Sequence, residues 1–296
     1  MTSDFQKGFL FSVGSFVSWG VLPIYWKHLG YYPPFDLVWF RMLSTAGIMA
    51  LILMFWTKKR RFISQMNVKV FAKLWLSGTM LSINWLVYVW AILDGRVLEC
   101  SLGYYINPLV NVFLGAIVLK ERLHVLQKSA VALAMMGVGI FSIGVGTLPW
   151  VSLVLAGSFG VYGLLKKTLK IEPISAFTVE SVGMLSWVLL ATLWLDLGAY
   201  AWQEAGSSIP LYLALASTGL VTVIPMLMYN IGVQLIPLGL IGMLQFLAPT
   251  IKFLLGVLVF NEPFGVVQLL GFIFIWFSLV LYVAPTTRFL RPRAVC

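Results

Sequence analysis

The sequence predicts an all-α, polytopic membrane protein with ten transmembrane helices arranged as two inverted five-helix repeats. Of the 296 residues, 60% are hydrophobic and only 10% are charged, a composition far from that of a soluble globular domain. Long apolar runs recur from Gly8 onward, each with about the 20 residues needed to cross roughly 30 Å of hydrocarbon. Several segments of the first half also recur in the second half at a nearly constant offset.

The apolar runs divide into ten spans with short connections. They begin near Gly8, Asp36, Phe71, Leu98, Gln127, Pro149, Ile174, Ile209, Ile231 and Val266. Only Lys7 precedes the first run as a basic residue and no small-residue cleavage site follows it, so we expect an uncleaved helix rather than a signal peptide. Most of the chain therefore lies in lipid, which leaves no room for a soluble catalytic domain.

The basic residues gather on one side of the membrane in this arrangement. Sixteen of the 20 Lys and Arg residues fall in the tails and connections on the side of the N-terminus, Lys166 and Lys167 among them. Only Lys27 and Arg96 fall on the opposite side. The positive-inside rule then places both termini in the cytoplasm. The net charge of +10 is thus a topology signal with some affinity for anionic headgroups, and we expect no nucleic-acid partner.

Residues that could hold a metal or form a disulfide framework are few and scattered. The two cysteines are Cys100 and Cys296, and the two histidines, His28 and His124, are isolated from each other. Neither pair has the spacing of a ligand set. We therefore expect no metal site and no cofactor.

An internal repeat is visible when the two halves are compared. The segment GSFVSWG at 14–20 recurs as GSFGVYG at 157–163, and residues 104–127 match residues 245–268 at an offset of about 141. The second match pairs prolines, glycines and glutamates, including Glu121 with Glu262. Such weak internal repeats are typical of transporters.

The repeat predicts the orientation of the two halves. Each copy holds five helices, at residues 1–146 and 147–296. Because five is odd, the second copy enters the membrane upside down, which gives a pseudo-twofold axis in the membrane plane.

Polar residues form matching stripes on spans related by the repeat. One face of the fourth span carries Tyr104, Asn107, Asn111 and Gly115, and the ninth span carries Gln245, Ala248, Lys252 and Gly256 at the same spacing. The third span carries Ser77, Asn84 and Tyr88, and the eighth carries Thr218, Thr222, Pro225 and Tyr229. Such stripes either join packed helices by hydrogen bonds or line a pathway. Their convergence by symmetry favours the pathway.

Three charges fall within predicted spans, namely Arg41, Glu180 and Lys252. A buried charge without a partner costs several kcal/mol, so each is a functional candidate. The structural alternatives are an ion pair of Arg41 with Glu99 or Asp36, and hydrogen bonds from Glu180 to the loops. Lys252 lies beside no obvious acid. We expect Lys252, together with Arg41, to attract a carboxylate, and Glu180 to be the protonatable residue if transport is proton-coupled.

Several motifs resemble one known family. INWLVYVWAI, LECSLGYYINPLVNVFLGAIVLKERL, GLVTVIPMLMYN and QFLAPTIKFLLGV are similar to the RarD proteins, a bacterial branch of the EamA family in the drug/metabolite transporter superfamily. The resemblance runs from about Gly8 to about Tyr282. It implies a multi-pass protein of the bacterial inner membrane, with a cavity lined by spans one, three, four, six, eight and nine. Spans one and six contribute Trp19 and Tyr162, while Lys252 departs from the uncharged residue usual in the branch.

The sequence thus favours a secondary transporter of small metabolites or drugs that works by alternating access, with export as the favoured direction. A passive facilitator or channel, and a membrane-embedded enzyme on lipid substrates, are the alternatives. The scattered acids argue against an enzyme. A homodimer would be compatible with the sequence. The predicted substrate contacts are Trp19, Asn84, Tyr88, Tyr104, Asn107, Asn111, Tyr162, Tyr229, Gln245 and Lys252.

Overall fold

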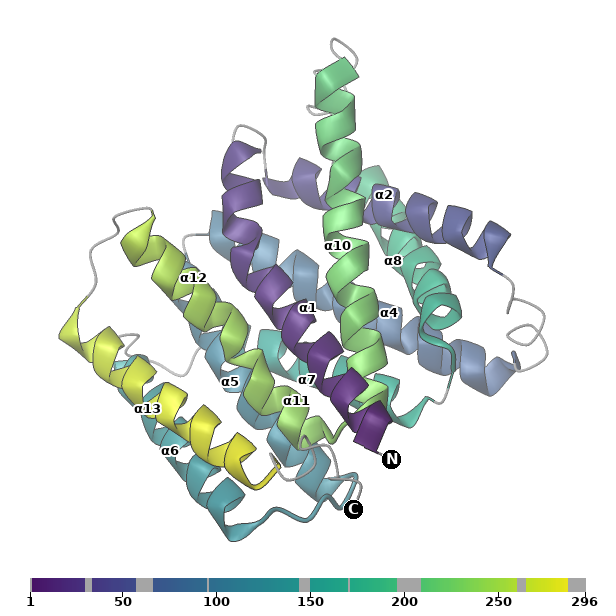
Figure 1. Ribbon diagram of the computed structural model, residues 1–296. Helices are drawn as coiled ribbons and strands as arrows, with labels where there is room; N and C mark the ends of the chain where they lie inside the picture. The colour runs from purple at the N-terminus through teal and green to yellow at the C-terminus, as the bar shows by residue number, and fades with distance from the viewer. Residues whose placement is uncertain are drawn as a thin grey trace.

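The computed structural model describes residues 2–29, 34–56, 66–94, 96–143, 150–169, 171–195, 209–259 and 265–286. In these residues the secondary structure is helical throughout (Figure 1). The α-helices are α1 (Thr2–His28), α2 (Pro34–Phe55), α4 (Val68–Leu93), α5 (Val97–Ile117), α6 (Val125–Ile143), α7 (Trp150–Thr168), α8 (Pro173–Leu195), α10 (Ile209–Leu235), α11 (Leu238–Gln245), α12 (Leu247–Leu258) and α13 (Val266–Val283). A short 3₁₀-helix, η1 (Ala284–Thr286), follows α13.

Six of the described helices are long and apolar enough to cross a membrane. These stretches are Asp4–Lys27, Asp36–Phe55, Val68–Ala91, Pro173–Trp194, Leu213–Leu235 and Leu238–Leu255. Shorter apolar stretches lie in α5, α6 and α13, at Leu102–Ile117, Val125–Ile140 and Leu269–Val283. The all-helical prediction is therefore confirmed for the described part of the chain.

The predicted start of the ninth span near Ile231 is wrong. Helix α10 continues to Leu235, and α11 begins only at Leu238. Pro237 has no N–H to continue α10, and it restricts the preceding residue to extended conformations, so the break falls there. The first span also starts earlier than Gly8, because the polar residues from Thr2 onward join α1.

Helices from the two halves of the chain interleave. Helix α1 packs against α10 and α12, while α7 packs against α4 and α5. Helix α2 lies between α10 and α8, α5 also packs on α11, and α6 pairs with α13 at one side (Figure 1). The lower ends of α1, α10 and α11 lie together in this view, whereas the upper ends of α10 and α12 diverge.

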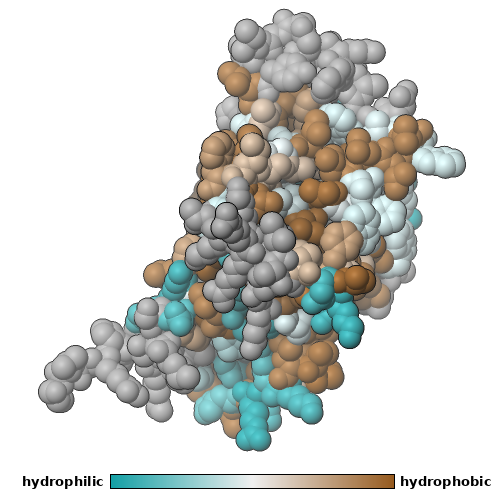
Figure 2. Space-filling view, turned by 90° about the vertical axis from the view of Figure 1, so that its right-hand side faces the viewer, coloured by the Kyte–Doolittle hydropathy of each residue, from teal (hydrophilic) through white to brown (hydrophobic). Residues whose placement is uncertain are grey.

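The outer surface is largely apolar. Figure 2 shows hydrophobic side chains over much of one face, with hydrophilic ones gathered toward its lower end. Leu193 and Trp194 near the end of α8 are 81% and 85% exposed, and similar residues lie along α12 and α13. Exposed apolar area of this extent suits a protein whose outer solvent is lipid.

The N-terminal end of α11 is held by a residue from the other half of the chain. The Glu121 carboxylate accepts hydrogen bonds from the backbone N–H groups of Leu238, at 2.7 Å, and Gly239, at 3.0 Å. A side chain at Gly115 would come within 2.7 Å of the same carboxylate, so this glycine leaves room for it. An anionic group at a helix N-terminus satisfies free donors and complements the helix dipole. Its predicted repeat partner, Glu262, lies outside the described residues.

We expect Gly78→Ala to destabilise the bundle, because a Cβ at Gly78 would lie 2.7 Å from the main-chain oxygen of Glu180 on α8. Backbone cannot move aside cheaply, so the cost should be about 1–3 kcal/mol. Gly47→Ala is the matched control, since nothing lies within 4 Å of its added Cβ. Thermal unfolding in detergent should show a lower Tm for Gly78→Ala only. Equal Tm values for both variants would contradict the close packing of α4 on α8.

Glu121→Gln should also lower the Tm, by the equivalent of about 1–2 kcal/mol, because only one oxygen and no charge would remain for the two N–H groups. Lys128→Gln on α6 removes an exposed charge nearby and serves as the control. A Glu121→Gln protein as stable as the control would show that the carboxylate does not hold α11 in solution.

Candidate functional site

Arg41 is held between α2, α4 and α10. Its Nε donates a hydrogen bond to Oγ1 of Thr222 on α10 at 2.7 Å. Its guanidinium carbon lies 4.0 Å from the centre of the Trp85 ring on α4, a cation–π contact. Three helices thus hold this cation in the bundle. The hydrogen bond to Thr222 uses Nε, so the two terminal guanidinium nitrogens take no part in it.

Lys252 on α12 joins the same region. Its Nζ lies 4.9 Å from the centre of the Tyr104 ring on α5, and the rings of Tyr104 and Tyr88 meet edge to face at 5.7 Å. Arg41 is close enough to Lys252, Tyr104 and Tyr88 to interact electrostatically with each. We call Arg41, Tyr88, Tyr104, Lys252 and Trp85 the cation cluster. Four of its five members were predicted as site residues, and the structure brings them together.

The cation cluster has no acid of its own in the part of the chain that the structure describes. No carboxylate there lies within ion-pair distance of Arg41 or Lys252, so the predicted pair of Arg41 with Asp36 does not form. The side chain of Glu99, the other predicted partner, lies outside the described residues. Two neighbouring cations inside a helical bundle repel each other and favour a bound anion.

A second group of predicted residues forms a buried amide network. Nδ2 of Asn111 donates to Oε1 of Gln245 at 2.8 Å and to Oδ1 of Asn107 at 3.2 Å. All three side chains are buried. The Oδ1 of Asn111 has no hydrogen-bond partner, and it faces Gly163 on α7. The network therefore joins α5 to α11 across the two halves of the chain.

Aromatic rings fill the space beside this network. Tyr229 on α10 stacks on Tyr162 of α7 at 5.9 Å, and it also meets Trp19 of α1 at 5.8 Å and Phe159 at 5.4 Å. We call Trp19, Phe159, Tyr162 and Tyr229 the aromatic cluster. Tyr162 and Tyr229 are fully buried. The resemblance implies matching positions for Trp19 and Tyr162. In the structure each of them contacts both Phe159 and Tyr229.

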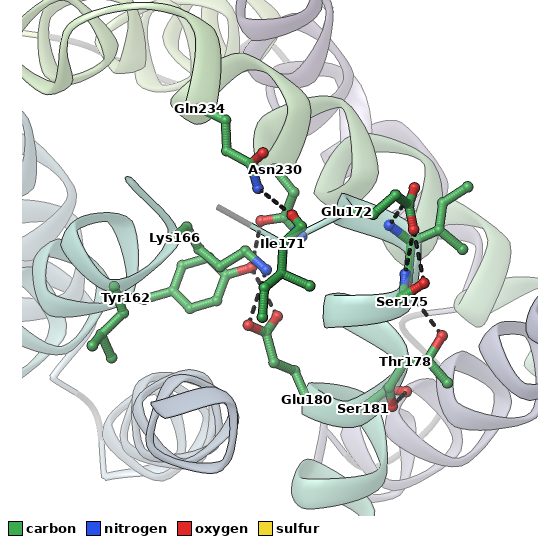
Figure 3. Close-up of polar contacts among 12 residues, drawn as sticks. Tyr162, Lys166, Ile171, Glu172, Ser175, Thr178, Glu180, Ser181, Asn230 and Gln234 are labelled. Carbon is green, nitrogen blue, oxygen red and sulfur yellow. Dashed lines mark hydrogen bonds and ion pairs between the residues drawn. The ribbon is translucent and has the colours of Figure 1, made fainter. Parts of the chain in front are cut away.

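Glu180 forms an ion pair that the sequence did not predict. Nζ of Lys166 on α7 lies 3.0 Å from Oε1 of Glu180 on α8, and both side chains are buried (Figure 3). Lys166 was expected among the basic residues of the cytoplasmic side, and the structure places it in the last turn of α7, which continues to Thr168. The partner of Glu180 is thus a helix residue, not a loop. The i, i+4 spacing from Tyr162 puts Lys166 on the same face of α7 as a predicted site residue, but that spacing does not identify Glu180 as its partner.

Asn84 takes part in helix packing. Its Nδ2 donates to the main-chain oxygen of Leu155 at 2.8 Å and to Oγ of Ser158 at 3.0 Å, both on α7. The amide nitrogen is therefore committed to the contact between α4 and α7. The repeat-related contact is similar, since Ser15 on α1 donates to the main-chain oxygen of Pro225 on α10 at 2.8 Å.

The predicted residues thus lie at two levels of the bundle. Helix α5, helix α10 and the α11–α12 pair each carry one residue at each level, seven positions apart. The upper level holds Tyr104, Thr222 and Lys252, and the lower level holds Asn111, Tyr229 and Gln245. Seven helical residues rise about 10 Å. The charged and aromatic side chains of the upper level are partly exposed, apart from Trp85, whereas Asn111, Tyr229 and Gln245 are buried. The upper level is the more accessible of the two.

The described residues contain no group of three His, Cys, Asp or Glu side chains able to hold a metal ion. The groups that the site presents are cations, aromatic rings and amides, with one buried ion pair between α7 and α8.

Comparisons with known proteins place the chain in a family. Residues 6–143 match the EamA-like transporter family. The chain is 38% identical to an uncharacterized transporter of Pseudomonas aeruginosa, over 98% of this chain and 97% of that protein. It is 36% identical to the uncharacterized transporter YojE of Bacillus subtilis, over 98% and 97% of the two chains. It is 32% identical to the protein RarD of Escherichia coli, over 94% of each.

The fold has a solved counterpart. One crystal structure superposes with a TM-score of 0.70 over 95% of this chain and 99% of the other, at 18% sequence identity. An identity this low supports the fold alone. The near full-length relatives carry the assignment further: this chain belongs to the EamA-like transporter family, as a RarD-like, multi-pass membrane protein.

Proposed function

We propose that this protein is a secondary transporter of small metabolites or drugs that works by alternating access between two inverted five-helix repeats, residues 1–146 and 147–296. The observation that carries the proposal is the cation cluster. It is a partly exposed pair of cations inside a helical bundle, without an acid among the described residues. Such a group belongs to a substrate pathway more readily than to a structural core.

The pattern of helix contacts supports the repeat. When the first five spans are exchanged for the last five, the contact of α1 with α10 becomes that of α7 with α4, and α1 with α12 becomes α7 with α5. The contact of α2 with α10 likewise becomes that of α8 with α4. Pairs such as α6 with α13 map onto themselves. A pseudo-twofold arrangement accounts for all of these at once.

The substrate carries a carboxylate that binds Arg41 and Lys252. Arg41 keeps its terminal guanidinium nitrogens for a bidentate contact, while Lys252 adds a point charge. Residues of the aromatic cluster and the amide network contact the rest of the molecule as it moves inward, and Glu180 is the coupling residue. We place the protein in a bacterial inner membrane and favour export, which fits relatives named as transporters. The chain is not an enzyme in this proposal.

Lys252→Met tests the anion site. Ligand stabilisation of the purified protein, measured as a Tm increase with a panel of small carboxylates, amino acids and amphenicols, should select carboxylates for the wild type. The variant should lose most of that selectivity, because Met keeps the length of the side chain but not its charge. Lys128→Met, exposed on α6, is the control. Unchanged carboxylate stabilisation in Lys252→Met, or stabilisation by neutral compounds alone, would contradict the anion site.

The selected carboxylate then separates a carrier from a passive facilitator. In proteoliposomes, a carrier shows trans-stimulation, in which unlabelled substrate on one side accelerates entry of labelled substrate from the other. A pore shows none. We expect trans-stimulation in the wild type and its loss in Lys252→Met.

Topology can be tested by thiol labelling in whole cells. Both native cysteines are replaced by serine, and a single cysteine is introduced in place of Asp94, between α4 and α5, or of Lys128, at the start of α6. With the termini in the cytoplasm, a membrane-impermeant maleimide should label Asp94→Cys in intact cells and Lys128→Cys only after permeabilisation. The reverse pattern would invert the proposed orientation.

A further inference from the structure

The Glu180–Lys166 ion pair is unusual because both of its side chains are buried. Its atoms are 3.0 Å apart, and the two side chains are 0% and 1% exposed. A buried ion pair is no more stabilising than apolar packing, yet loss of one partner is costly because the other charge is left alone. The pair is thus stable in one charge state and unstable after a single protonation, which is the property of a switch.

The groups that face Glu180 come from four helices. From α7 come Lys166 and Tyr162, and from α10 comes Asn230, which Tyr162 contacts (Figure 3). Helix α4 presents Gly78 and the Ser77 hydroxyl, and α2 approaches α8 at Met49. Among the described residues, Lys166 is therefore the charged group that faces this carboxylate.

Tyr162 connects the pair to the rest of the pathway. Its hydroxyl donates to Oδ1 of Asn230 at 2.7 Å and lies 3.5 Å from Oε2 of Glu180. The same ring stacks on Tyr229. Helix α10, which carries Tyr229 and Asn230, also carries Thr222, the residue that holds Arg41. One helix therefore contacts both the ion pair and the cation cluster.

We propose that Glu180 and Lys166 together form the binding site of a coupling proton, and that its occupancy decides whether the inner end of the bundle is closed. This rests on the proposed transport function. The carboxylate of Glu180 takes up one proton and becomes a neutral acid, while Lys166 stays an ammonium ion. Release of that proton on the other side of the membrane restores the pair, so one proton crosses for each cycle.

Protonation favours opening for a physical reason. With Glu180 neutral, the buried Lys166 ammonium has lost its counter-charge. Lys166 lies two residues before the end of α7, about 3 Å along the helix axis, so a small movement toward that end brings it to cytoplasmic water. At this end of the bundle Glu121 accepts a hydrogen bond from the first residue of α11, and Lys167 donates to the main-chain oxygen of Ile236 at 2.7 Å. The ion pair and these contacts occur together in the structure, and in the proposal they separate together.

The test measures opening directly and needs no substrate. On a background with both native cysteines replaced by serine, Leu238→Cys places a thiol at a fully buried position of the inner end. Its rate of maleimide labelling in proteoliposomes is measured between pH 8 and pH 6. Each rate is divided by that of an exposed Lys128→Cys thiol, which corrects for the pH dependence of the reaction itself. We expect the corrected rate to rise by up to about tenfold for each unit by which the pH falls, because the protonated fraction of a group above its pKa rises by that factor.

The double variant Lys166→Met/Glu180→Gln carries no charge at the site, so it is expected to fold and to show a corrected rate that is independent of pH. Lys73→Met, which removes an exposed lysine of α4, should keep the wild-type response. Tyr162→Phe, which removes only a hydroxyl, should fold and show a smaller response.

The proposal is overturned if the double variant keeps the wild-type pH response, if the wild type has none, or if Lys73→Met loses it equally. If the double variant does not fold, Tyr162→Phe decides, and an unchanged response there overturns the proposal. Failure of the transport function itself is a different result, namely a wild type that responds to pH but shows no trans-stimulation by any carboxylate.

Discussion

The lipid solvent, which offers no hydrogen bonds, is the constraint on which the rest of this structure depends. Every polar group inside the bundle must find a protein partner, and most do. Asn111 bonds to Gln245 and Asn107, Asn84 bonds to α7, and Glu180 bonds to Lys166. The cation cluster differs because its charges meet aromatic rings and one hydroxyl rather than an acid. That contrast separates groups that hold the helices together from groups available to a substrate.

Glycines and helix breaks determine how closely these partners approach. Gly163 leaves room for the Tyr229 hydroxyl and for Asn111, and Gly78 brings α4 against the backbone of α8 at Glu180. The break at Pro237 starts α11 where Glu121 can accept its first N–H groups. Apart from the contact of Gly163 with Tyr229, these contacts join helices of the first half of the chain to helices of the second half. A movement of one half against the other would have to separate them.

Single helices carry residues of both levels of the site. Helix α10 holds Arg41 through Thr222 at one level and contacts Tyr162 through Asn230 at the other. A single helix that touches both the cation cluster and an ion pair is a physical route for coupling, because a tilt of α10 alters both sets of contacts.

The sequence by itself determined the helical class, the approximate position of most spans and the stripes that contain Tyr104, Asn111, Gln245 and Lys252. Hydrophobic length and helical spacing are local properties, so they can be seen in the residues alone. Only the tertiary structure decided the partners. It paired Glu180 with Lys166 rather than with a loop, left Arg41 without Asp36 and assigned Asn84 to helix packing. Those outcomes depend on which helices lie side by side, and contacts between residues far apart in the chain have no signature in local spacing.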